Sequence, residues 1–187
     1  MNKLADIASC VIIPTYNNSK TLKQIIDGVL NFSTGKDVIV INDGSTDDSI
    51  EILTQYKERI VLLHNKTNSG KGYSLRKGFG EAITRGFKNA ITIDSDGQHY
   101  PEDIAIMIEY ALKYPKTLLM GSRNMNHESV PGKSSFGNKF SNFWFWFETG
   151  IQLEDTQSGY RLYPLLHIPK KYYTKKFEFE IEVIVRS

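Results

Sequence analysis

Short apolar runs rich in β-branched residues alternate along the chain with longer segments in which apolar residues recur every three or four positions. The first pattern predicts buried strands, and the second predicts helices with one apolar face. Strands are expected at residues 9–14, 38–42, 60–64, 91–94 and 118–121. Helices are expected at residues 19–31, from 45 onward, at 69–86 and from 101 onward. This alternation predicts an α/β fold with a mostly parallel sheet and helices on both faces.

Polar residues directly follow each of the five expected strands. In parallel sheets, ligands bind at the carboxyl ends of the strands, so these residues are expected to share one edge of the sheet. They comprise Thr15, Tyr16 and Asn17, then Asp43, Gly44 and Ser45, then residues 65–71, then Asp94, Ser95 and Asp96, and finally Ser122 and Arg123. We therefore expect a binding site along this edge.

The fourth of these clusters places two carboxylates, Asp94 and Asp96, one residue apart. Two carboxylates this close repel each other unless a cation lies between them. A hard divalent ion such as Mg²⁺ or Mn²⁺ takes one or two carboxylates and completes its coordination with water and phosphate, and Gln98 offers a further oxygen. A solvated Asp-rich turn is the competing interpretation, but the position directly after a strand favours a metal site.

Two further clusters suit parts of a nucleotide. Asp43 follows the second strand, where a carboxylate could accept hydrogen bonds from ribose hydroxyls or from a base N–H. Asp47 and Asp48 come next and are expected to cap the following helix instead. Gly70 and Lys71 open the third helix, where a glycine allows close backbone approach and the N-terminal amides attract phosphate, although the spacing is not that of a P-loop.

The regular alternation ends near residue 122. A run of aromatic residues between 136 and 147 has helical spacing, which indicates core packing. Phe145 and Trp146 lie off that stripe and would suit contact with a lipid or a membrane interface. The last segment, residues 177–186, alternates like a strand but also fits the start of a helix, and we favour the helix.

Two cations in this region are candidates for phosphate binding. Arg123 follows the fifth strand, and its guanidinium is well shaped for phosphate oxygens. Lys139 lies in the helix expected next, near the same edge of the sheet. For each of them, a solvated surface cation is the competing interpretation.

Three glycines and one cysteine are expected to serve packing. Gly78, Gly80 and Gly86 lie in or beside the third helix, where small residues permit close approach of neighbouring elements. Cys10 is the only cysteine and lies in an apolar run, so we expect a buried, unreactive thiol and no disulfide within the chain.

The chain of 187 residues, with 40% apolar and 24% charged residues, is typical of one soluble domain. The net charge of +2 gives no indication of a nucleic-acid partner. Residues 113–187 carry 11 basic and 7 acidic residues, which mildly suits an anionic partner. The N-terminus lacks the apolar block of a signal peptide, and no apolar run is long enough to span a bilayer, so we expect a cytoplasmic protein.

Seven segments, taken in order, resemble family 2 glycosyltransferases of the GT-A fold, and most closely the dolichyl- or polyprenyl-phosphate glycosyltransferases. The segments are VIIPTYNN, INDGSTDDS, NSGKGYSLRKGFGEA, ITIDSDGQHYPEDI, GSRN, DTQSGYRLY and FEFEIEVIVR. The resemblance covers nearly the whole chain from Cys10 onward. Each motif is weak alone, but seven in the same order are specific.

The resemblance implies a nucleotide-sugar donor at the polar edge. Within the family pattern, Pro14, Tyr16 and Asp43 match nucleotide contacts. The segment Asp94 to Gln98 matches the Asp-x-Asp-x-Gln motif, which binds the metal and the donor diphosphate. Together with the polar clusters, the expected donor-binding residues are Pro14, Thr15, Tyr16, Asn17, Asp43, Gly70, Lys71, Asp94, Ser95 and Asp96, with Asp94, Asp96 and Gln98 as metal ligands.

The resemblance also implies an acceptor site and a catalytic centre. Arg123 and Lys139 match positions near the sugar and the acceptor phosphate. Asp155, in the segment DTQSG, matches an acidic position at the catalytic centre. We therefore expect Asp155 and Arg123 to act in catalysis, and Arg123 and Lys139 to bind the acceptor phosphate.

The sequence departs from the family pattern in three places. Asn18 replaces the glutamate of the motif Pro-x-Tyr-Asn-Glu, and Asn42 stands where many relatives have a second aspartate before Asp43. Family members usually continue beyond the FEFE segment. We accordingly expect residues 1–187 to form a single glycosyltransferase domain that is cut short at its C-terminus.

The implied reaction moves a sugar from a GDP- or UDP-linked donor to a polyprenyl or dolichyl phosphate, with inversion and with Mg²⁺ or Mn²⁺ as cofactor. Such a lipid acceptor places the protein peripherally at the cytoplasmic face of the membrane. A lipid phosphate is already anionic, so Asp155 would orient it, whereas a sugar-hydroxyl acceptor in cell-surface polysaccharide synthesis would make Asp155 the general base. A non-catalytic nucleotide-sugar-binding domain is a further alternative, and the sequence predicts no oligomeric state.

A nucleotidyltransferase is the remaining alternative, because such enzymes also combine an α/β sheet with a metal ion. They should show a basic, glycine-rich loop after the first strand. The segment PTYNNSK lacks such a loop, which argues against this class.

Overall fold

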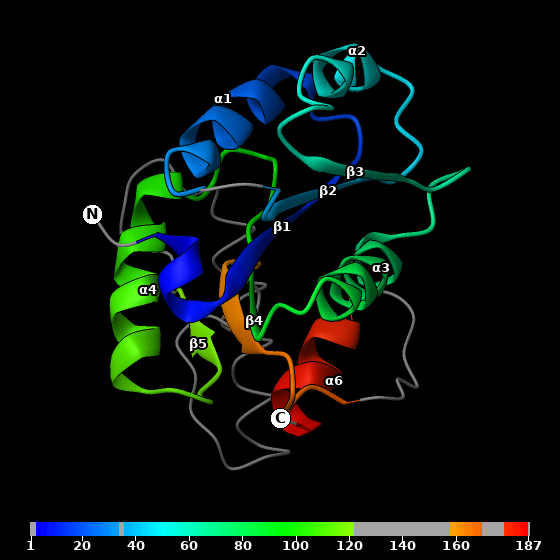
Figure 1. Cartoon of the computed structure of the whole chain (residues 1–187). Coiled ribbons are helices and arrows are strands. Elements are labelled where there is room, and N and C mark those ends of the chain that lie inside the picture. The colour runs from blue at the N-terminus through cyan, green and yellow to red at the C-terminus, as the bar shows by residue number, and fades with distance from the viewer. Residues whose placement is uncertain (1–2, 34–35, 122–157, 170–177, 187) are drawn as a thin grey trace, which may run out of the picture.

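The computed structural model describes residues 3–33, 36–121, 158–169 and 178–186 (Figure 1). Arg123, Lys139, Asp155 and the aromatic stretch 136–147 lie outside these described residues. In chain order the elements are η1 (Leu4–Ile7), β1 (Ser9–Thr15), α1 (Ser19–Leu30), β2 (Val38–Asn42), α2 (Ser49–Thr54), β3 (Val61–His64), α3 (Lys71–Thr84), β4 (Asn89–Thr92), η2 (Pro101–Asp103), α4 (Ile104–Lys113), β5 (Leu119–Met120), β6 (Arg161–Pro164) and α6 (Glu178–Arg186).

Most elements form where the hydrophobic pattern predicts them. Both ends of β1, β2 and β3 lie within one residue of the expected positions. The last segment forms α6, which confirms its interpretation as a helix. β4 begins and ends two residues earlier than expected, so Asp94 lies beyond the strand rather than in it. β6 was not predicted, because its four residues, RLYP, begin with a charge, end with proline and are all buried, which leaves no alternation to detect.

The six strands among the described residues form one sheet in the order β3-β2-β1-β4-β6-β5. The pairs β3–β2, β2–β1 and β1–β4 are parallel, whereas β6 is antiparallel to both β4 and β5. This arrangement confirms the predicted mostly parallel sheet of an α/β fold. It also brings the start of β6 to the edge at which the parallel strands end.

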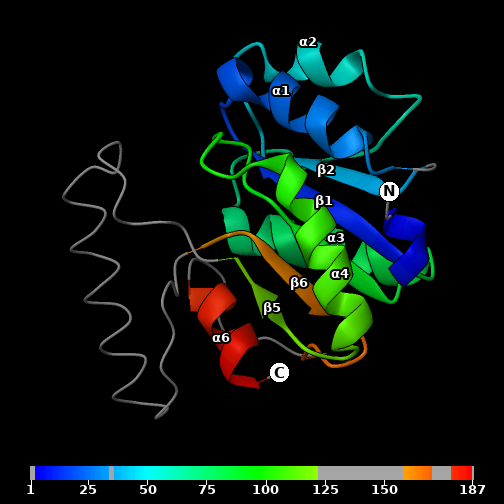
Figure 2. The same cartoon turned by 90° about the vertical axis from the view of Figure 1, so that its left-hand side faces the viewer.

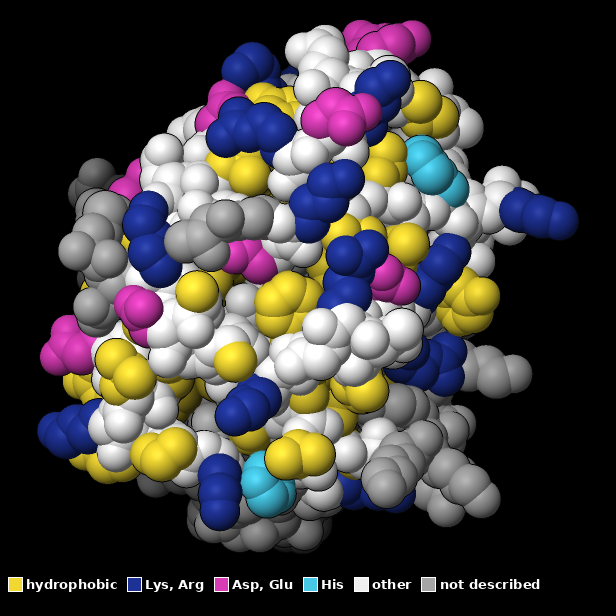
Figure 3. Space-filling view, viewed as in Figure 1, with side chains coloured by type: hydrophobic (Ala, Val, Ile, Leu, Met, Phe, Trp, Pro, Cys, Tyr) yellow, Lys and Arg dark blue, Asp and Glu magenta, His cyan; other side chains and the backbone are white. Residues whose placement is uncertain are grey.

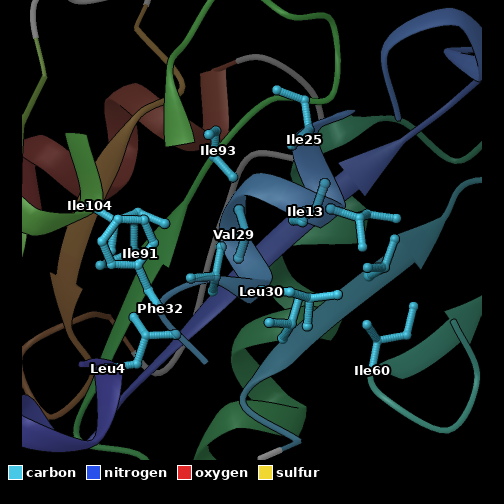
Figure 4. Close-up of a cluster of buried hydrophobic side chains, with 14 of the residues drawn as sticks. Leu4, Ile13, Ile25, Val29, Leu30, Phe32, Ile60, Ile91, Ile93 and Ile104 are labelled. Atoms are coloured by element: carbon cyan, nitrogen blue, oxygen red, sulfur yellow. The ribbon is translucent and has the colours of Figure 1, made fainter. Parts of the chain in front are cut away.

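Helices cover both faces of the sheet, as expected (Figures 1 and 2). On one face, apolar residues of η1, α1, α2 and α4 pack against side chains such as Ile13 of β1 and Ile91 of β4 (Figure 4). On the other face, α3 and α6 pack against the alternate residues of the same strands, including Ile12 of β1. The period of two along each strand therefore divides the core between two layers of helices.

Cys10 and the molecular surface match the expectations from composition. Cys10 is fully buried under α3, and burial raises the pKa of its thiol, which confirms an unreactive side chain. Charged side chains of both signs are spread over the face shown in Figure 3, with hydrophobic side chains between them. In the part of the chain that the structure describes, no helix has the length and apolar character needed to cross a bilayer.

Asp47 joins the starts of two helices. Its Oδ2 accepts a hydrogen bond of 3.0 Å from the backbone N–H of Ser19 in α1, and its Oδ1 accepts one of 3.1 Å from the N–H of Ser49 in α2. Partial burial alone would raise the pKa of Asp47, but these hydrogen bonds outweigh it and lower the pKa to about 2. The predicted capping role is confirmed for Asp47, whereas the side chain of Asp48 makes no cap hydrogen bond.

Gly78 allows α3 to lie close against the sheet. A Cβ at Gly78 would lie 2.7 Å from Cγ2 of Ile12 and 3.0 Å from Cδ1 of Ile41, so no larger residue fits without movement of the strands. A Cβ at Gly80 or Gly86 would meet nothing within 4 Å. The predicted packing role is therefore confirmed for Gly78 and wrong for Gly80 and Gly86.

We expect Gly78→Ala and Gly80→Ala to change stability in opposite directions. The first should destabilise the fold by about 1–3 kcal/mol because the added methyl overpacks the core. The second should stabilise it by about 0.5–1 kcal/mol because alanine favours the helix and has free space. Urea unfolding followed by circular dichroism measures both, and equal effects of the two substitutions would contradict this account of α3.

We expect Asp47→Asn to lower stability near neutral pH, with a difference from the unaltered protein that shrinks below about pH 4. A carboxylate whose pKa is lowered on folding stabilises the protein above its unfolded value, and this contribution is lost as pH falls through the folded value of about 2. Urea unfolding between pH 6 and pH 3 measures the difference, with Asp48→Asn as the control. A difference that stays constant over this range would disprove the role of the Asp47 charge.

Candidate active site

The strand register gathers the polar loops at one edge of the sheet. Thr15 of β1 pairs with Asn42 of β2, and Asn42 pairs with His64 of β3. β4 is in register with β1 up to Thr92, so the residues that follow β4 emerge at the same edge. A cavity of about 410 Å³ opens there, lined by Pro14, Thr15, Tyr16, Asn18, Asp43, Asn68, Gly70, Lys71, Ser74, Asp94, Ser95 and Asp96.

Nearly all of the predicted donor-site residues in the described ranges line this one cavity. The exception is Asn17, whose Oδ1 accepts a 2.8 Å hydrogen bond from the backbone N–H of Thr46. Gln98, predicted as a metal ligand, is also absent from the cavity wall, and the roles of both residues remain predictions. The wall adds Asn18 and Ser74, which were not predicted to bind the donor, and Asn68, which belongs to the polar cluster 65–71 but was not singled out.

Asp43 shapes the loop that leads into α3. It is only 4% exposed, and Asn65 donates a hydrogen bond of 2.7 Å to its Oδ1. The backbone N–H of Ser69 donates to the same oxygen over 2.9 Å, and that of Gly70 donates to Oδ2 over 2.8 Å. The amide of Gly70, expected to face phosphate, is therefore bonded to this carboxylate instead.

Asn65 extends this arrangement toward α3. Its Nδ2 lies 3.0 Å from Oγ of Ser74 in the first turns of the helix, and its Oδ1 accepts a 3.1 Å hydrogen bond from Lys77. The side chain is 8% exposed, so these hydrogen bonds satisfy a buried amide. Asn65 thereby fixes Asp43 against the start of α3.

Ser95 ties the loop after β4 to the loop after β1. Its Oγ donates a 3.1 Å hydrogen bond to the carbonyl of Pro14 and accepts one of 2.8 Å from Nδ2 of Asn18. The residue is 1% exposed, so the contact with Pro14 is buried, whereas the one with Asn18 is partly buried. The flanking carboxylates, Asp94 and Asp96, line the cavity on either side of this anchored residue.

The chemistry of the two carboxylates fits a hard divalent cation. The cavity holds a cationic group at Asp94, because the ammonium of Lys71 lies 2.7 Å from Oδ1 and 2.9 Å from Oδ2. Asp96 is exposed, and its Oδ1 accepts a 3.0 Å hydrogen bond from the backbone N–H of Gln98. The described residues contain no cluster of three or more potential His, Cys, Asp or Glu ligands. One or two carboxylates are enough to hold Mg²⁺ or Mn²⁺ when water and phosphate supply the other ligands.

Lys71 is part of a larger charged cluster behind the cavity. Its ammonium lies 3.2 Å from Oε2 of Glu180 in α6, and Oε1 of Glu180 lies 3.6 Å from Arg161 at the start of β6. Burial alone would lower the pKa of Lys71, but the attraction of Asp94 and Glu180 outweighs it and raises the pKa. The lysine is therefore charged at neutral pH.

Gly159 lets the chain pass beside this ion pair. A Cβ at Gly159 would lie 2.2 Å from Oδ2 of Asp94 and 2.6 Å from Nζ of Lys71. The carbonyl of Gly159 accepts a 2.7 Å hydrogen bond from Thr92, which fixes the backbone there. Only glycine fits at this position while Lys71 and Asp94 remain paired.

Asn65, Arg161 and Glu180 were not predicted as individual site residues. A signal was present for two of them, because Arg161 and Glu180 lie in the family segments DTQSGYRLY and FEFEIEVIVR. Asn65 directly follows a strand and belonged to a polar cluster that was recognised as a whole. What the sequence could not show was that these residues meet Lys71 and Asp43.

We expect Asp43→Asn to loosen the loop before α3 and to destabilise the protein by about 1–3 kcal/mol, because an amide cannot accept hydrogen bonds at both positions. Hydrogen exchange should accelerate at the amides of Ser69 and Gly70. Asp6→Asn, a change in an acidic residue away from the cavity, is the control. Unchanged exchange at both amides in a folded Asp43→Asn variant would contradict the assignment.

Known proteins share both the sequence pattern and the fold of this chain. The family model of glycosyl transferase family 2 matches residues 10–165. The UDP-N-acetylglucosamine–dolichyl-phosphate N-acetylglucosaminyltransferase of Methanococcus voltae is 28% identical over 86% of this chain and 70% of its own length. The polyprenol monophosphomannose synthase of Mycolicibacterium smegmatis is 29% identical over 82% of this chain and 60% of its own length. The chain thus spans about two thirds of the length of these two curated relatives.

The fold has a close match among solved structures. The glucosyl-3-phosphoglycerate synthase of Mycobacterium tuberculosis, solved with Mn²⁺, uridine-diphosphate-glucose and phosphoglyceric acid, aligns with a TM-score of 0.73 at 19% identity. The alignment covers 97% of this chain and 65% of that one, and it confirms the GT-A fold. With the family model matching most of its length, this chain belongs to glycosyltransferase family 2.

Proposed function

We propose that this chain binds a nucleotide-sugar in the cavity at the strand ends and transfers the sugar to a polyprenyl or dolichyl phosphate at a membrane surface. The observation that carries the proposal is the single cavity wall that unites Tyr16, Asp43, Lys71, Asp94 and Asp96. The relatives named for dolichyl-phosphate and polyprenol substrates support this acceptor class. The chain spans only part of the length of these relatives, so the transfer reaction is proposed and not inferred directly from their names.

The nucleoside would bind at the β1 side of the cavity. Tyr16 is 42% exposed in the wall, so its ring is available to stack on a base. Thr15 is 2% exposed, and its Oγ1 has no hydrogen-bond partner within the described structure, which leaves a polar atom for a ligand. Asp43 would contribute chiefly by holding the loop before α3 in place.

The diphosphate and metal would bind at the β4 side. Asp94 and Asp96 would hold Mg²⁺ or Mn²⁺, and the metal would neutralise charge on the departing nucleoside diphosphate. Lys71 adds a further positive charge in the same wall. Ser95 keeps both carboxylates in place through its bonds to Pro14 and Asn18.

The acceptor would bind next to the donor sugar, through residues outside the described ranges. We propose that Arg123 and Lys139 bind the acceptor phosphate. Such a phosphate is already ionised at neutral pH and can attack the anomeric carbon without a general base, so Asp155 would orient it. A sugar-hydroxyl acceptor would instead need a base at Asp155.

A transfer assay with each acceptor class tests the proposal. The full chain, with Mn²⁺ and radiolabelled UDP- and GDP-sugars, should transfer sugar to polyprenyl phosphate and not to oligosaccharides. Asp94→Asn should lose about 100-fold or more of this activity, and EDTA should abolish it. Asp27→Asn, which alters an exposed surface ion pair with Lys23, should leave it unchanged. Transfer to oligosaccharides alone would refute the lipid-phosphate acceptor.

Asp155→Asn separates the two roles of that carboxylate. With a lipid-phosphate acceptor we expect a loss of less than about tenfold, because orientation is weakened while no proton transfer is removed. The rate is measured by single-turnover transfer at saturating donor. A loss of several orders of magnitude would show that Asp155 is a base and would overturn the orienting role.

A further inference from the structure

Four charged side chains from separate parts of the fold form one continuous cluster beside the cavity. Lys71 begins α3, Asp94 follows β4, Arg161 begins β6 and Glu180 lies in α6. Lys71 contacts both Asp94, at 2.7 Å, and Glu180, at 3.2 Å, while Arg161 lies 3.6 Å from Glu180. The two cations and two carboxylates balance one another in charge.

The inner half of this cluster is fixed and the outer half faces the cavity. The side chains of Arg161 and Glu180 are each 1% exposed, and Arg161 also donates 3.2 Å hydrogen bonds to the carbonyl of Glu180 and to the hydroxyl of Tyr163. Lys71 and Asp94 are 29% and 22% exposed and line the cavity. Glu180 therefore holds the ammonium of Lys71 at Asp94 from behind.

This arrangement opposes a divalent cation that arrives alone. An ion at Asp94 would lie close to the ammonium of Lys71, and like charges at such distances repel strongly in a partly buried site. Lys71 cannot move deeper without approaching Arg161. Because these four charges already balance, Asp96 would offset only one of the ion's two positive charges, and a nucleoside diphosphate would offset the other.

We propose that Lys71 is a built-in counter-ion of Asp94 that makes divalent-cation binding at this carboxylate depend on the diphosphate of the donor. This inference rests on the proposed function, because it takes the metal and the nucleotide to share the cavity. The metal and nucleotide then bind together, and Lys71, retained by Glu180, stays beside the diphosphate. Lys71 acts here as a positioning residue, and Glu180 and Arg161 act through it.

Mn²⁺ binding in the presence and absence of UDP or GDP tests the inference, with electron paramagnetic resonance as the readout and no sugar transfer required. In the unaltered chain, nucleotide should tighten Mn²⁺ binding strongly, and Mn²⁺ should tighten nucleotide binding by the same factor. Lys71→Met, which keeps the apolar stem, should tighten nucleotide-free Mn²⁺ binding by about tenfold or more. The factor by which nucleotide tightens Mn²⁺ binding should therefore be smaller in Lys71→Met than in the unaltered chain.

Two further variants complete the test. One should shift Mn²⁺ affinity in the opposite direction, and the other is a control. Glu180→Gln leaves the cluster with one excess positive charge, so nucleotide-free Mn²⁺ should bind more weakly than in the unaltered chain. Lys23→Met also removes a lysine that is paired with a carboxylate, Asp27 at 2.6 Å, but this lysine lies on α1 and does not line the cavity. It should leave Mn²⁺ binding unchanged. Circular dichroism establishes that each variant is folded.

Two outcomes would overturn the inference. The first leaves the proposed function intact, and the second also contradicts the proposed metal dependence. If Mn²⁺ binds with nucleotide but Lys71→Met leaves nucleotide-free affinity unchanged or lower, the counter-ion role is wrong and the proposed function stands. If no Mn²⁺ binding that is sensitive to Asp94→Asn occurs even with nucleotide, the proposed metal dependence is wrong as well. Opposite shifts in Lys71→Met and Glu180→Gln support the inference, since general damage to the fold would weaken binding in both.

Discussion

The parallel pairing of β1 between β2 and β4 is the constraint on which the site depends. This register places the ends of the strands in line, so that the loops bearing Thr15, Asp43 and Asp94 meet without any long excursion of the chain. A shift of one residue would turn each strand's side chains to the opposite face and separate the two core layers from their helices. The same hydrophobic alternation that divides the core therefore also aligns the polar edge.

Within that edge, the charged residues serve the fold and the cavity at once. Asp43 faces the cavity but bonds to the backbone of the loop before α3. Lys71 faces the cavity but pairs with Glu180 of the last helix. A buried charge is stable only when it is paired, so these contacts are conditions for burying the groups. These contacts consequently tie the cavity wall to the loop before α3 and to α6.

The sequence predicted much of this, and its failures share a physical cause. Strands such as β2 and the carboxylates Asp94 and Asp96 follow from local patterns, because alternation and strand ends are visible in a short window. β6 and the Lys71–Glu180 contact depend on pairing between distant segments, and a short window carries no signal for them. Asp43 is an intermediate case. Its position at the polar edge was predicted, but its hydrogen bonds to the amides of Ser69 and Gly70 depend on how the loop folds back.

The antiparallel insertion of β6 has a consequence for folding. β4 and β5 do not pair with each other, and both acquire their partner only when Arg161–Pro164 has emerged. Among the described residues, no other strand pairs with that side of β4, and an unpaired strand edge favours association with other chains. Closing this side of the sheet therefore depends on pairing between segments far apart in the chain, which makes it a late step of folding.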